Sequence, residues 1–310
     1  MFVSDASKLS PVTEPELSKT VALCNPHGTL NRAAVGWSRH PVHDCTLYRR
    51  WPRKKRWNYW CITSDHYLFS CTLSTIDYAG LAFVYWLDFE SKEFIERTWT
   101  VPLARGIEMS DTVEGRCAYN GQGTRVAFEQ SKDRVTLDMR CKRFGSGPLE
   151  ASISIDVPKD HETLNVVIPW DDRHYQFTSK QHAMRATGAV AFDGKTIAFD
   201  PSSAYACLDF GRGVWPYRST WNWGGGSGRS TEGHIVGLNL GAKWTDGTGM
   251  TENGILVDGT LRKISEDLAF DYDTANYMAP WRIRTKQTNE VDLIFTPFYE
   301  RIATSNVVAV

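Results

Sequence analysis

Residues 211–259 read GRGVWPYRSTWNWGGGSGRSTEGHIVGLNLGAKWTDGTGMTENGILVDG. Tryptophans, a Tyr-Arg pair, a glutamate and several amides lie among glycines and short β-type runs. Glycine lets the backbone turn sharply or approach a neighbour closely, and tryptophan supplies a large apolar area with one N–H group that needs an acceptor. This combination indicates the lining of a cavity rather than a surface loop. The stretch contains no phosphate-binding loop, nucleophile elbow or complete set of metal ligands, so it identifies no reaction.

The composition is that of an ordinary soluble protein with a high share of aromatic residues. The chain of 310 residues is 42% hydrophobic and 23% charged, has a net charge of −1 and contains 12 tryptophans. A chain of this length can bury a large core and form two domains. Its near-zero charge argues against a protein that binds nucleic acid through bulk electrostatics. The aromatic share predicts a rigid interior lined by rings.

Seven cysteines stand at irregular spacings and form no C-x-x-C motif. Their odd number, in a chain too long to need disulfide staples, predicts reduced and mostly buried thiols in a reducing cytoplasm. The first residues, MFVSDASKLSPVTEPELSK, are polar and acidic, unlike a signal peptide. No apolar run approaches the ~18 residues of a membrane span. These features predict a soluble, cytoplasmic protein.

Short apolar runs bounded by Gly, Pro, Asp, Asn or Ser recur along the chain, whereas helical periodicity is rare. This spacing is typical of all-β barrels and sandwiches. Asp193-Gly194 and Asp258-Gly259 each separate two such runs, and Asp-Gly is a strong signal for a tight β-hairpin. The expected strands include 67–73, 81–89, 96–101, 125–130, 135–141, 151–157, 195–199, 204–209, 234–240, 255–257, 260–264, 268–272 and 291–297.

The predicted organisation has three parts. Residues 1–22 form an arm with a short helix from Glu14 to Ala22, residues 23–175 form a first barrel, and residues 176–310 form a second. The motifs WNYW at 57–60 and WNW at 221–223 both precede strand-like runs, an echo that either duplication or chance explains. The final run, SNVVAV at 305–310, predicts an edge strand whose neighbouring position is unfilled.

Three segments resemble a known family. The sequences GTLN from Gly28, VGWSRHP from Val35, and the stretch 213–259 with WNW, GLNLG, TEN and a VDG turn are similar to domain of unknown function 2804, from about Leu23 onward. Members of that family continue for a few tens of residues, which implies that the second barrel is truncated here. The pattern is more loosely similar to the lipocalin-like group of carotenoid hydratases, tocopherol cyclases and fungal Diels–Alderases. The resemblance implies two tandem lipocalin-like antiparallel β-barrels packed side by side, with a cavity for an isoprenoid or polyketide. It lends no single activity.

The first candidate site is the aromatic cluster of the opening stretch. If this segment is extended, neighbouring side chains alternate between two faces, so the tryptophans gather on shared faces. An apolar slot with a few polar groups is the usual make-up of a small-molecule site. The alternative is a packed aromatic core in which the arginine forms a structural ion pair. The candidate ligand-binding residues are Trp215, Trp221, Asn222 and Trp223, with Tyr217 and Arg218 as candidate catalytic groups.

Glu252 is the candidate proton donor. Burial of a carboxyl group in an apolar cavity raises its pKa, so that it can hold a proton near neutral pH and pass it to an alkene or a carbonyl. Arg218 nearby would instead lower that pKa and keep Glu252 ionised. Asn239 and Asn253 would add polar contacts to the ligand. The alternative is a loop in which Asp246 and Asn253 bond the backbone.

Two features lie nearer the N-terminus. The run HPVHDC at 40–45 has metal-ligating side chains, but a structural zinc site needs a second pair of ligands and the sequence shows none. No metal and no cofactor is therefore expected. Arg39 and Trp37 lie in a segment that matches the family, so the resemblance implies that both contact the ligand.

The run RRWPRKKRW at 49–57 is the only dense group of basic residues. Interleaved tryptophans would suit a loop that docks on anionic lipid or a nucleic-acid patch. A solvated loop is the simplest interpretation, membrane contact the second, and nucleic acid the last, so nucleic acid is not expected as a partner.

These patterns predict a protein that binds an extended hydrophobic molecule in an aromatic-lined cavity and acts on it by cofactor-free acid–base chemistry, as a lyase or isomerase would. The alternatives are a lipid carrier without catalysis and an aromatic-rich carbohydrate-active or carbohydrate-binding protein. A buried ionisable group in a dry pocket favours the enzyme, an apolar pocket without one favours the carrier, and an open groove with exposed tryptophans favours a sugar.

Overall fold

The computed structural model describes residues 13–303, which fall into two compact units that are treated separately below. The larger unit ends at Ser265, and the smaller begins at Glu266. Almost all of the regular structure is β-strand. The predicted all-β class is confirmed.

The larger unit contains twenty strands and one short 3-10 turn, η2 (Arg32–Ala34). The strands are β1 (Val21–Ala22), β2 (Trp37–Ser38), β3 (His43–Asp44), β4 (Lys54–Thr63), β5 (Tyr67–Thr75), β6 (Ala79–Asp88), β7 (Phe94–Pro102), β8 (Ile107–Glu108), β9 (Gly115–Gly121), β10 (Thr124–Gln130), β11 (Arg134–Phe144), β12 (Gly147–Asp156), β13 (Leu164–Pro169), β14 (Tyr175–Phe192), β15 (Lys195–Phe199), β16 (Tyr205–Val214), β17 (Asn222–Arg229), β18 (Ile235–Ala242), β19 (Asn253–Val257) and β20 (Thr260–Ile264).

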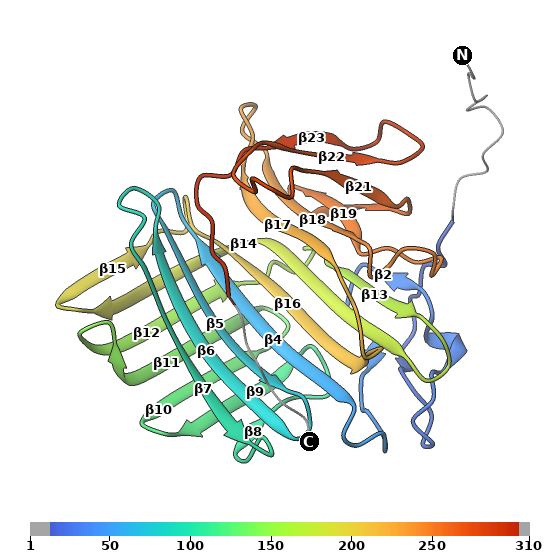
Figure 1. Cartoon of the computed structure of the whole chain (residues 1–310), viewed down its shortest axis with the longest axis horizontal. Coiled ribbons are helices and arrows are strands. Elements are labelled where there is room, and N and C mark those ends of the chain that lie inside the picture. The colour runs from blue at the N-terminus through green and yellow to red at the C-terminus, as the bar shows by residue number, and fades with distance from the viewer. Residues whose placement is uncertain (1–12, 304–310) are drawn as a thin grey trace. The chain divides into compact units, whose positions relative to one another are not determined.

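Most of these strands join one curled 14-stranded sheet, in the order β7-β6-β5-β4-β16-β14-β12-β11-β10-β9-β8 along its main path. Two antiparallel meanders form its arms, β4–β7 and β8–β12, and β14 and β16 connect them (Figure 1). Strand β5 contacts β9 and β7 contacts β11, so the two arms face each other. The sheet thereby curls around a core of its own.

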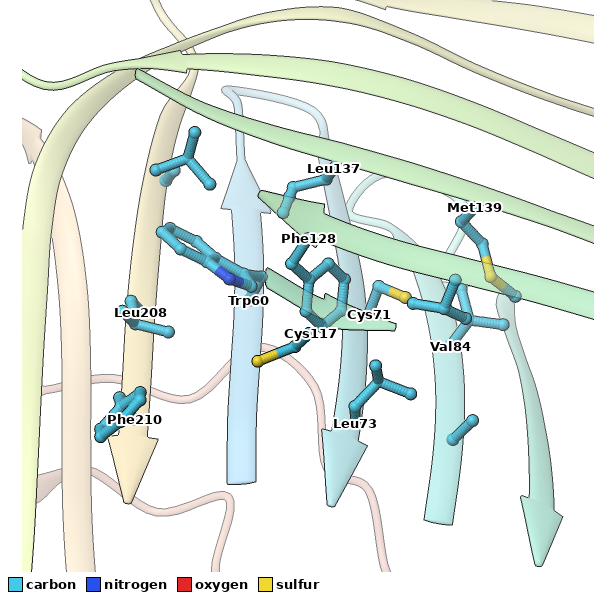
Figure 2. Packing of buried hydrophobic residues seen from close by; sticks show 14 of the residues in the cluster. Trp60, Cys71, Leu73, Val84, Cys117, Phe128, Leu137, Met139, Leu208 and Phe210 are labelled. Carbon is cyan, nitrogen blue, oxygen red and sulfur yellow. The ribbon is translucent and has the colours of Figure 1, made fainter. Parts of the chain in front are cut away.

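Alternation of side chains fills that core. In β11, for example, Val135, Leu137, Met139 and Cys141 are buried while the residues between them point away. Period-two patterning of this kind commits one face of a strand to the interior. Figure 2 shows Trp60 and Leu73 of one arm beside Phe128 and Leu137 of the other.

Strand β14 is 18 residues long, and this length lets its two halves pair with different strands. Its first half pairs with β13 and β16, and its second half pairs with β12 and β15. A register shift between Gln181 and Met184, with Ala183 at φ 60°, marks a bulge where the strand changes partners. The predicted barrel boundary between residues 175 and 176 falls at the start of this strand and stays a prediction.

A second, four-stranded antiparallel sheet, β17-β18-β19-β20, contacts β14 and β16 (Figure 1). A separate hydrophobic cluster that includes Trp37, Leu164, Trp215 and Trp244 lies there. The larger unit thus has two cores, each bounded by curved antiparallel strands, in accord with the predicted lipocalin-like double architecture. All seven cysteines are unpaired and six are buried, as predicted.

The smaller unit is a three-stranded antiparallel sheet, β21-β22-β23, from β21 (Leu268–Asp271), β22 (Trp281–Thr285) and β23 (Asp292–Phe295). Trp281 stacks on Tyr272, with ring centroids 4.2 Å apart. Arg282 forms an ion pair with Asp292 across the β22–β23 pair. The edge strand predicted for 305–310 lies outside the described residues.

The helix predicted over Glu14–Ala22 is wrong. The segment is extended because its backbone bonds to residues far along the chain: Trp37 N donates to Pro15 O at 2.9 Å, and Leu17 N donates to Trp37 O at 2.7 Å. The last two residues of the segment form β1, which pairs with β3. Between residues 13 and 303 there is no helix long and apolar enough to cross a membrane.

Candidate functional site

The candidate site is a cavity of about 270 Å³ in the larger unit. It lies between one face of the large sheet, at β14, β16 and β4, and the four-stranded sheet, at β17 to β19. Three rows of residues, in register across the three large-sheet strands, carry the first wall, which Lys55, Trp57, Thr178, Lys180 and Asp209 line. Because side chains two residues apart share a face, these rows look out on the same side of the sheet. From β14 to β16 to β4 the rows are Gln176-Gly213-Lys55, Thr178-Gly211-Trp57 and Lys180-Asp209-Tyr59.

Tryptophan rings make the rest of the wall. Trp215 and Trp244 stack with centroids 5.2 Å apart, and Trp57 and Trp221 meet the edge or face of Trp215 at 5.9 and 6.1 Å. Buried indole N–H groups are satisfied, since Trp215 Nε1 donates to Gln176 Oε1 at 2.7 Å. Trp221 is 59% exposed and forms the part of the wall that reaches solvent.

Two glycines make room for the functional side chains. A Cβ atom on Gly211 would lie 2.1 Å from the Trp57 ring, and a Cβ on Gly241 would lie 2.2 Å from Glu252 Oε1. Real Cβ atoms do not approach other atoms this closely, so the ring and the carboxyl group occupy space that only glycine leaves free. Gly211 and Gly241, both in the stretch 211–259, therefore serve the site by letting other side chains lie close to the backbone.

A buried ionic cluster lies at the inner end of the cavity. Lys180 Nζ is 2.8 Å from Asp209 Oδ1 and 3.1 Å from Glu252 Oε2. The side chains of Lys180 and Glu252 are 4% and 1% exposed. Glu252 Oε1 accepts a hydrogen bond from the indole N–H of Trp244. In the described part of the chain no hydrogen-bond donor is aligned with Glu252 Oε2, which is left with the ionic contact alone.

The environment adjusts the proton affinities of the cluster. Burial raises the pKa of Glu252; the Lys180 ammonium opposes this and Asp209 adds to it, and the net pKa lies above the ordinary glutamate value. Burial by itself would lower the pKa of Lys180, but Asp209 and Glu252 outweigh it, so the pKa of Lys180 is raised. Lys180 is therefore a permanent cation near neutral pH, while Glu252 takes up a proton more readily than an exposed glutamate.

Asn239 on β18 organises this end of the site. Its Oδ1 accepts from the indole N–H of Trp223 at 2.9 Å and lies 3.2 Å from His182 Nε2. Its Nδ2 donates to the backbone carbonyl of Glu252. The ammonium of Lys180 stands 4.9 Å from the centroid of Trp223. Asn239 thus fixes the positions of a wall residue and of Glu252.

The predicted site residues of the stretch 211–259 divide into three groups. Trp215, Trp221, Trp223 and Glu252 line the cavity. Asn239, Asn222 and Asn253 are buried beside it, and Asn253 Oδ1 accepts from Gly241 N at 2.7 Å. Tyr217 and Arg218 line a separate, open hollow with Lys243 and Asp246, and Tyr217 is 88% exposed. Lys180, not Arg218, is the cation in contact with Glu252.

Trp37 and Arg39 connect the N-terminal segment around Glu14 and Glu16 to the rest of the larger unit. Trp37 Nε1 donates to Glu14 O at 3.3 Å, and Arg39 forms ion pairs with Glu16 and Glu162 at 3.0 and 2.7 Å. Neither residue lines the cavity. His43 is buried with Nε2 2.9 Å from Ala34 O, and residues 13–303 contain no group of three metal-ligating side chains.

The basic run 49–57 contributes to the cavity through its C-terminal end. Lys55 and Trp57 of β4 line it. Lys54 pairs with Asp77 at 3.6 Å and Arg56 with Asp111 at 3.5 Å. Contact of this run with anionic membranes stays a prediction.

Sequence reasoning missed Lys180, Asp209, Lys55, Trp57 and Trp244. The neighbours of Lys180, in the segment TSKQH at 178–182, are polar, so nothing in the local sequence marks this lysine as buried. Its two carboxylate partners are 29 and 72 positions away in the sequence, so only the strand register brings the three together.

Comparisons with known proteins give a family and a likeness of fold. A family model described as "Domain of unknown function (DUF2804)" matches residues 14–310. None of the curated proteins matches the sequence. Kievitone hydratase from Nectria haematococca is similar in structure, with 11% identity and a TM-score of 0.46 over 80% of this chain and 77% of that one. CghA in complex with Sch210972 has 13% identity and a TM-score of 0.48 over 76% of this chain and 73% of that one. Likeness at this level carries no argument about the reaction.

Proposed function

Because the chain belongs to the DUF2804 family, whose description names no activity, we propose a function from the cavity itself: the protein binds the apolar end of a hydrophobic small molecule and catalyses a proton transfer on it through Glu252. The arrangement of Glu252 carries the proposal. One of its oxygens is held by the Trp244 indole, and the other meets only the Lys180 ammonium at the inner end of a tryptophan-lined cavity.

The proposed step is general acid–base catalysis without a cofactor. Protonated Glu252 gives its proton to a polarised double bond, whose π electrons form the new C–H bond, or to a carbonyl oxygen of the ligand, whose lone pair forms the new O–H bond. The carboxylate left behind is stabilised by Lys180. Loss of a proton from an adjacent carbon to Glu252 then completes an isomerisation. In a cyclisation, the π electrons of a second double bond of the ligand first form a C–C bond to the electron-poor carbon, and the same proton loss follows. Attack by water would instead complete a hydration, with one water proton returning to Glu252.

The walls of the cavity suit such a reaction. Positive charge that develops on the ligand would face the π surfaces of Trp215, Trp223 and Trp244, which attract cations. A volume of about 270 Å³ accommodates a ring or a short branched segment. An extended isoprenoid or polyketide would place its reactive end inside and leave the remainder near exposed Trp221.

Two alternatives make different use of the same residues. A lipid carrier would use the aromatic walls and need no proton from Glu252. A carbohydrate-active protein is favoured by the presence of two carboxylates, Asp209 and Glu252, in a cavity with an exposed tryptophan, since glycoside hydrolysis uses a pair of carboxyl groups. Lys180 between the two carboxylates favours the proton-transfer proposal, because it ties Asp209 into an ion pair.

The test begins with the ligand that the protein retains. Protein purified under native conditions is extracted, and mass spectrometry identifies the co-purifying molecule by its chemical class. That molecule is then incubated with the protein in D₂O. We expect the wild-type protein to place deuterium on carbon, and Glu252→Gln to lower the rate of incorporation by at least about a hundredfold, the usual range for a general acid.

Glu90→Gln, at an exposed turn of the same unit, serves as the control and should leave deuterium incorporation unchanged. Equal incorporation by wild-type protein and Glu252→Gln would remove Glu252 from the mechanism. A ligand returned without deuterium by the wild-type protein would indicate a carrier, and a bound oligosaccharide would favour the carbohydrate-active alternative.

A further inference from the structure

Lys55 provides the cavity with a second cation, in a different place from Lys180. It lies on the same face of the sheet, in the row Gln176-Gly213-Lys55, and lines the cavity. The row that contains Lys180 is four residues further along the strands, or about 13 Å at ~3.3 Å per residue. A ligand that spans the cavity would therefore meet one cation near each end.

The two lysines differ in how their charges are balanced. Lys180 contacts two carboxylates within 3.1 Å. For Lys55, by contrast, no carboxylate oxygen of residues 13–303 lies within ion-pair distance, and its Nζ stands 5.1 Å from the centroid of the Trp215 ring. An aromatic face attracts a cation but does not neutralise its charge. Lys55 is therefore available to an anionic ligand group, whereas Lys180 is not.

The surroundings of Lys55 add to the positive potential. Arg53 donates to the backbone carbonyl of Trp215 at 2.7 Å, and its guanidinium carbon lies 3.6 Å from the centroid of the Tyr217 ring. Burial of Lys55, helped by the nearby charge of Arg53, lowers its pKa, as expected for a partly buried ammonium without a counter-ion. The charged residues of the lining are Lys55, Lys180, Asp209 and Glu252. The lining therefore carries no net charge when both carboxylates are ionised, and one positive charge when Glu252 holds a proton.

We propose that Lys55 selects ligands with an anionic group, such as a carboxylate, and thereby orients them with their apolar, reactive portion toward Glu252. This inference rests on the proposed function and narrows its ligand class to amphipathic acids, with the anionic group roughly 10–13 Å from the reacting bond, the distance set by the strand spacing. An anion at this end would also complete the charge balance of the lining in the protonated form of Glu252.

The test compares two probes of the same shape and different charge. 1-Naphthaleneacetate and 1-naphthaleneacetamide are titrated against the protein at pH 7, with quenching of tryptophan fluorescence as the readout. We expect the wild-type protein to bind the carboxylate about tenfold more tightly than the amide, a typical difference for one charge-assisted contact. Lys55→Met should abolish the preference by weakening binding of the carboxylate to about that of the amide, and Lys55→Arg should retain the preference.

Lys54→Met is the matched control. Lys54 precedes Lys55 on β4, points to the opposite face and pairs with Asp77, so its removal should leave the preference intact. Equal affinities for the two probes in wild-type protein, unaltered by Lys55→Met, would overturn the role of Lys55 while leaving the cavity proposal in place. Failure of both probes to bind wild-type protein would contradict the cavity proposal and this inference together. A thermal melt of each variant confirms that it is folded.

Discussion

At the scale of single residues, the cluster of Lys180, Asp209 and Glu252 combines one buried and one partly buried carboxylate with a buried ammonium. Removing one partner from a buried ionic group generally costs more than the group itself contributes, because an uncompensated charge is left behind. The stability of the protein therefore depends on which members of the cluster are removed, and this gives a test of its geometry.

We expect Lys180→Met to lower the free energy of unfolding by about 3–5 kcal/mol at pH 7, because two carboxylates would then face each other without a cation. Protonation of Glu252 relieves the repulsion. Since its folded-state pKa is raised above the unfolded value, stability is present at low pH and is lost as the pH rises through that raised pKa. The variant should therefore recover stability on acidification below pH 7. Urea unfolding at several pH values measures this.

A double variant serves as the control for the Lys180 prediction. Lys180→Met combined with Glu252→Gln removes the second negative charge and should recover most of the lost stability at neutral pH. If the double variant were as unstable as Lys180→Met alone, the two side chains would not interact as the distance of 3.1 Å requires.

His182 should give the protein a measurable sensitivity to acid. Burial lowers its pKa to about 4, although the bond to Asn239 opposes the shift. Between the ordinary histidine pKa near 6.5 and this value, the unfolded chain binds a proton that the folded protein excludes, so stability falls as the pH drops through that window. The full effect is roughly 3 kcal/mol. We expect His182→Gln to flatten the dependence, measured by denaturant unfolding between pH 4 and pH 7.

His43 and His161 have lowered pKa values for the same reason, burial, and should preserve a remaining slope in the His182→Gln variant. An unchanged slope in that variant would show that His182 is not the buried neutral group. A slope that disappears entirely would assign no part to the other two histidines.

At the scale of elements, the cavity depends on how β16 carries its glycines. Gly211 lies between Thr178 and Trp57 in the three-strand register, directly under the Trp57 ring. A strand with a side chain at this position would push the ring into the space that the ligand is proposed to fill. The depth of the cavity is therefore a property of the backbone of β16.

We expect Gly211→Ala to lower the free energy of unfolding by about 1–3 kcal/mol, the range for overpacking, and to weaken binding of 1-naphthaleneacetamide. Gly224→Ala is the control, since a Cβ atom at Gly224 on β17 would meet no heavy atom within 4 Å. Thermal melts and the fluorescence titration measure both effects. Similar behaviour of the two variants would place the Trp57 ring elsewhere.

Two hairpin turns and strand β4 show which parts of the fold the sequence could predict and which it could not. Asp193-Gly194 and Asp258-Gly259 form two-residue hairpin turns, with positive φ at both residues of each turn, as the Asp-Gly signal predicts. Such turns are local, so local sequence suffices. Strand β4 was overlooked because its first residues read as a basic loop, although Lys55 and Lys54 alternate between two faces as strand residues do.

The candidate site was predictable only in part, for a related reason. Trp215, Trp221 and Trp223 lie close together in sequence, and Glu252 belongs to the same glycine-rich stretch, so composition could group them. The placement of Lys180 depends on the register of β14 with β16 and on the packing of a second sheet. A slip of one residue in that register would turn Lys180 away from Asp209, and no local pattern fixes such a register.

At the scale of the whole larger unit, Arg212 joins segments that are distant in sequence. It is fully buried, and it donates to Ser110 O, Trp57 O and Asn58 Oδ1 at 2.7–3.1 Å. Burial lowers its pKa to about 10, so the guanidinium remains charged near neutral pH. It thereby holds the loop that precedes β9 against β4 and β16, and connects the two arms of the curled sheet.

We expect Arg212→Met to destabilise the protein by about 3 kcal/mol or more, because several buried acceptors would lose their donor. Arg56→Met is the matched control: Arg56 stands opposite Arg212 in the β4–β16 register, and its ion pair with Asp111 is partly exposed. Its loss should cost less than about 1 kcal/mol. Equal destabilisation of the two variants, measured by urea unfolding, would contradict this role for Arg212.

The pairing of β4 with β16, and of β12 with β14, also has a consequence for the time course of synthesis. Each meander is bounded on one side by a strand whose partner is synthesised later. Strand β4 pairs with β16, which follows the whole second meander, and β12 pairs with the second half of β14. On a translating ribosome, both meanders would be complete in sequence while those edges still had open hydrogen-bonding groups, which are templates for association with other chains. Residues 175–214 would end that interval, so a pause in translation before them should increase aggregation of the nascent protein, whereas the same pause after them should not.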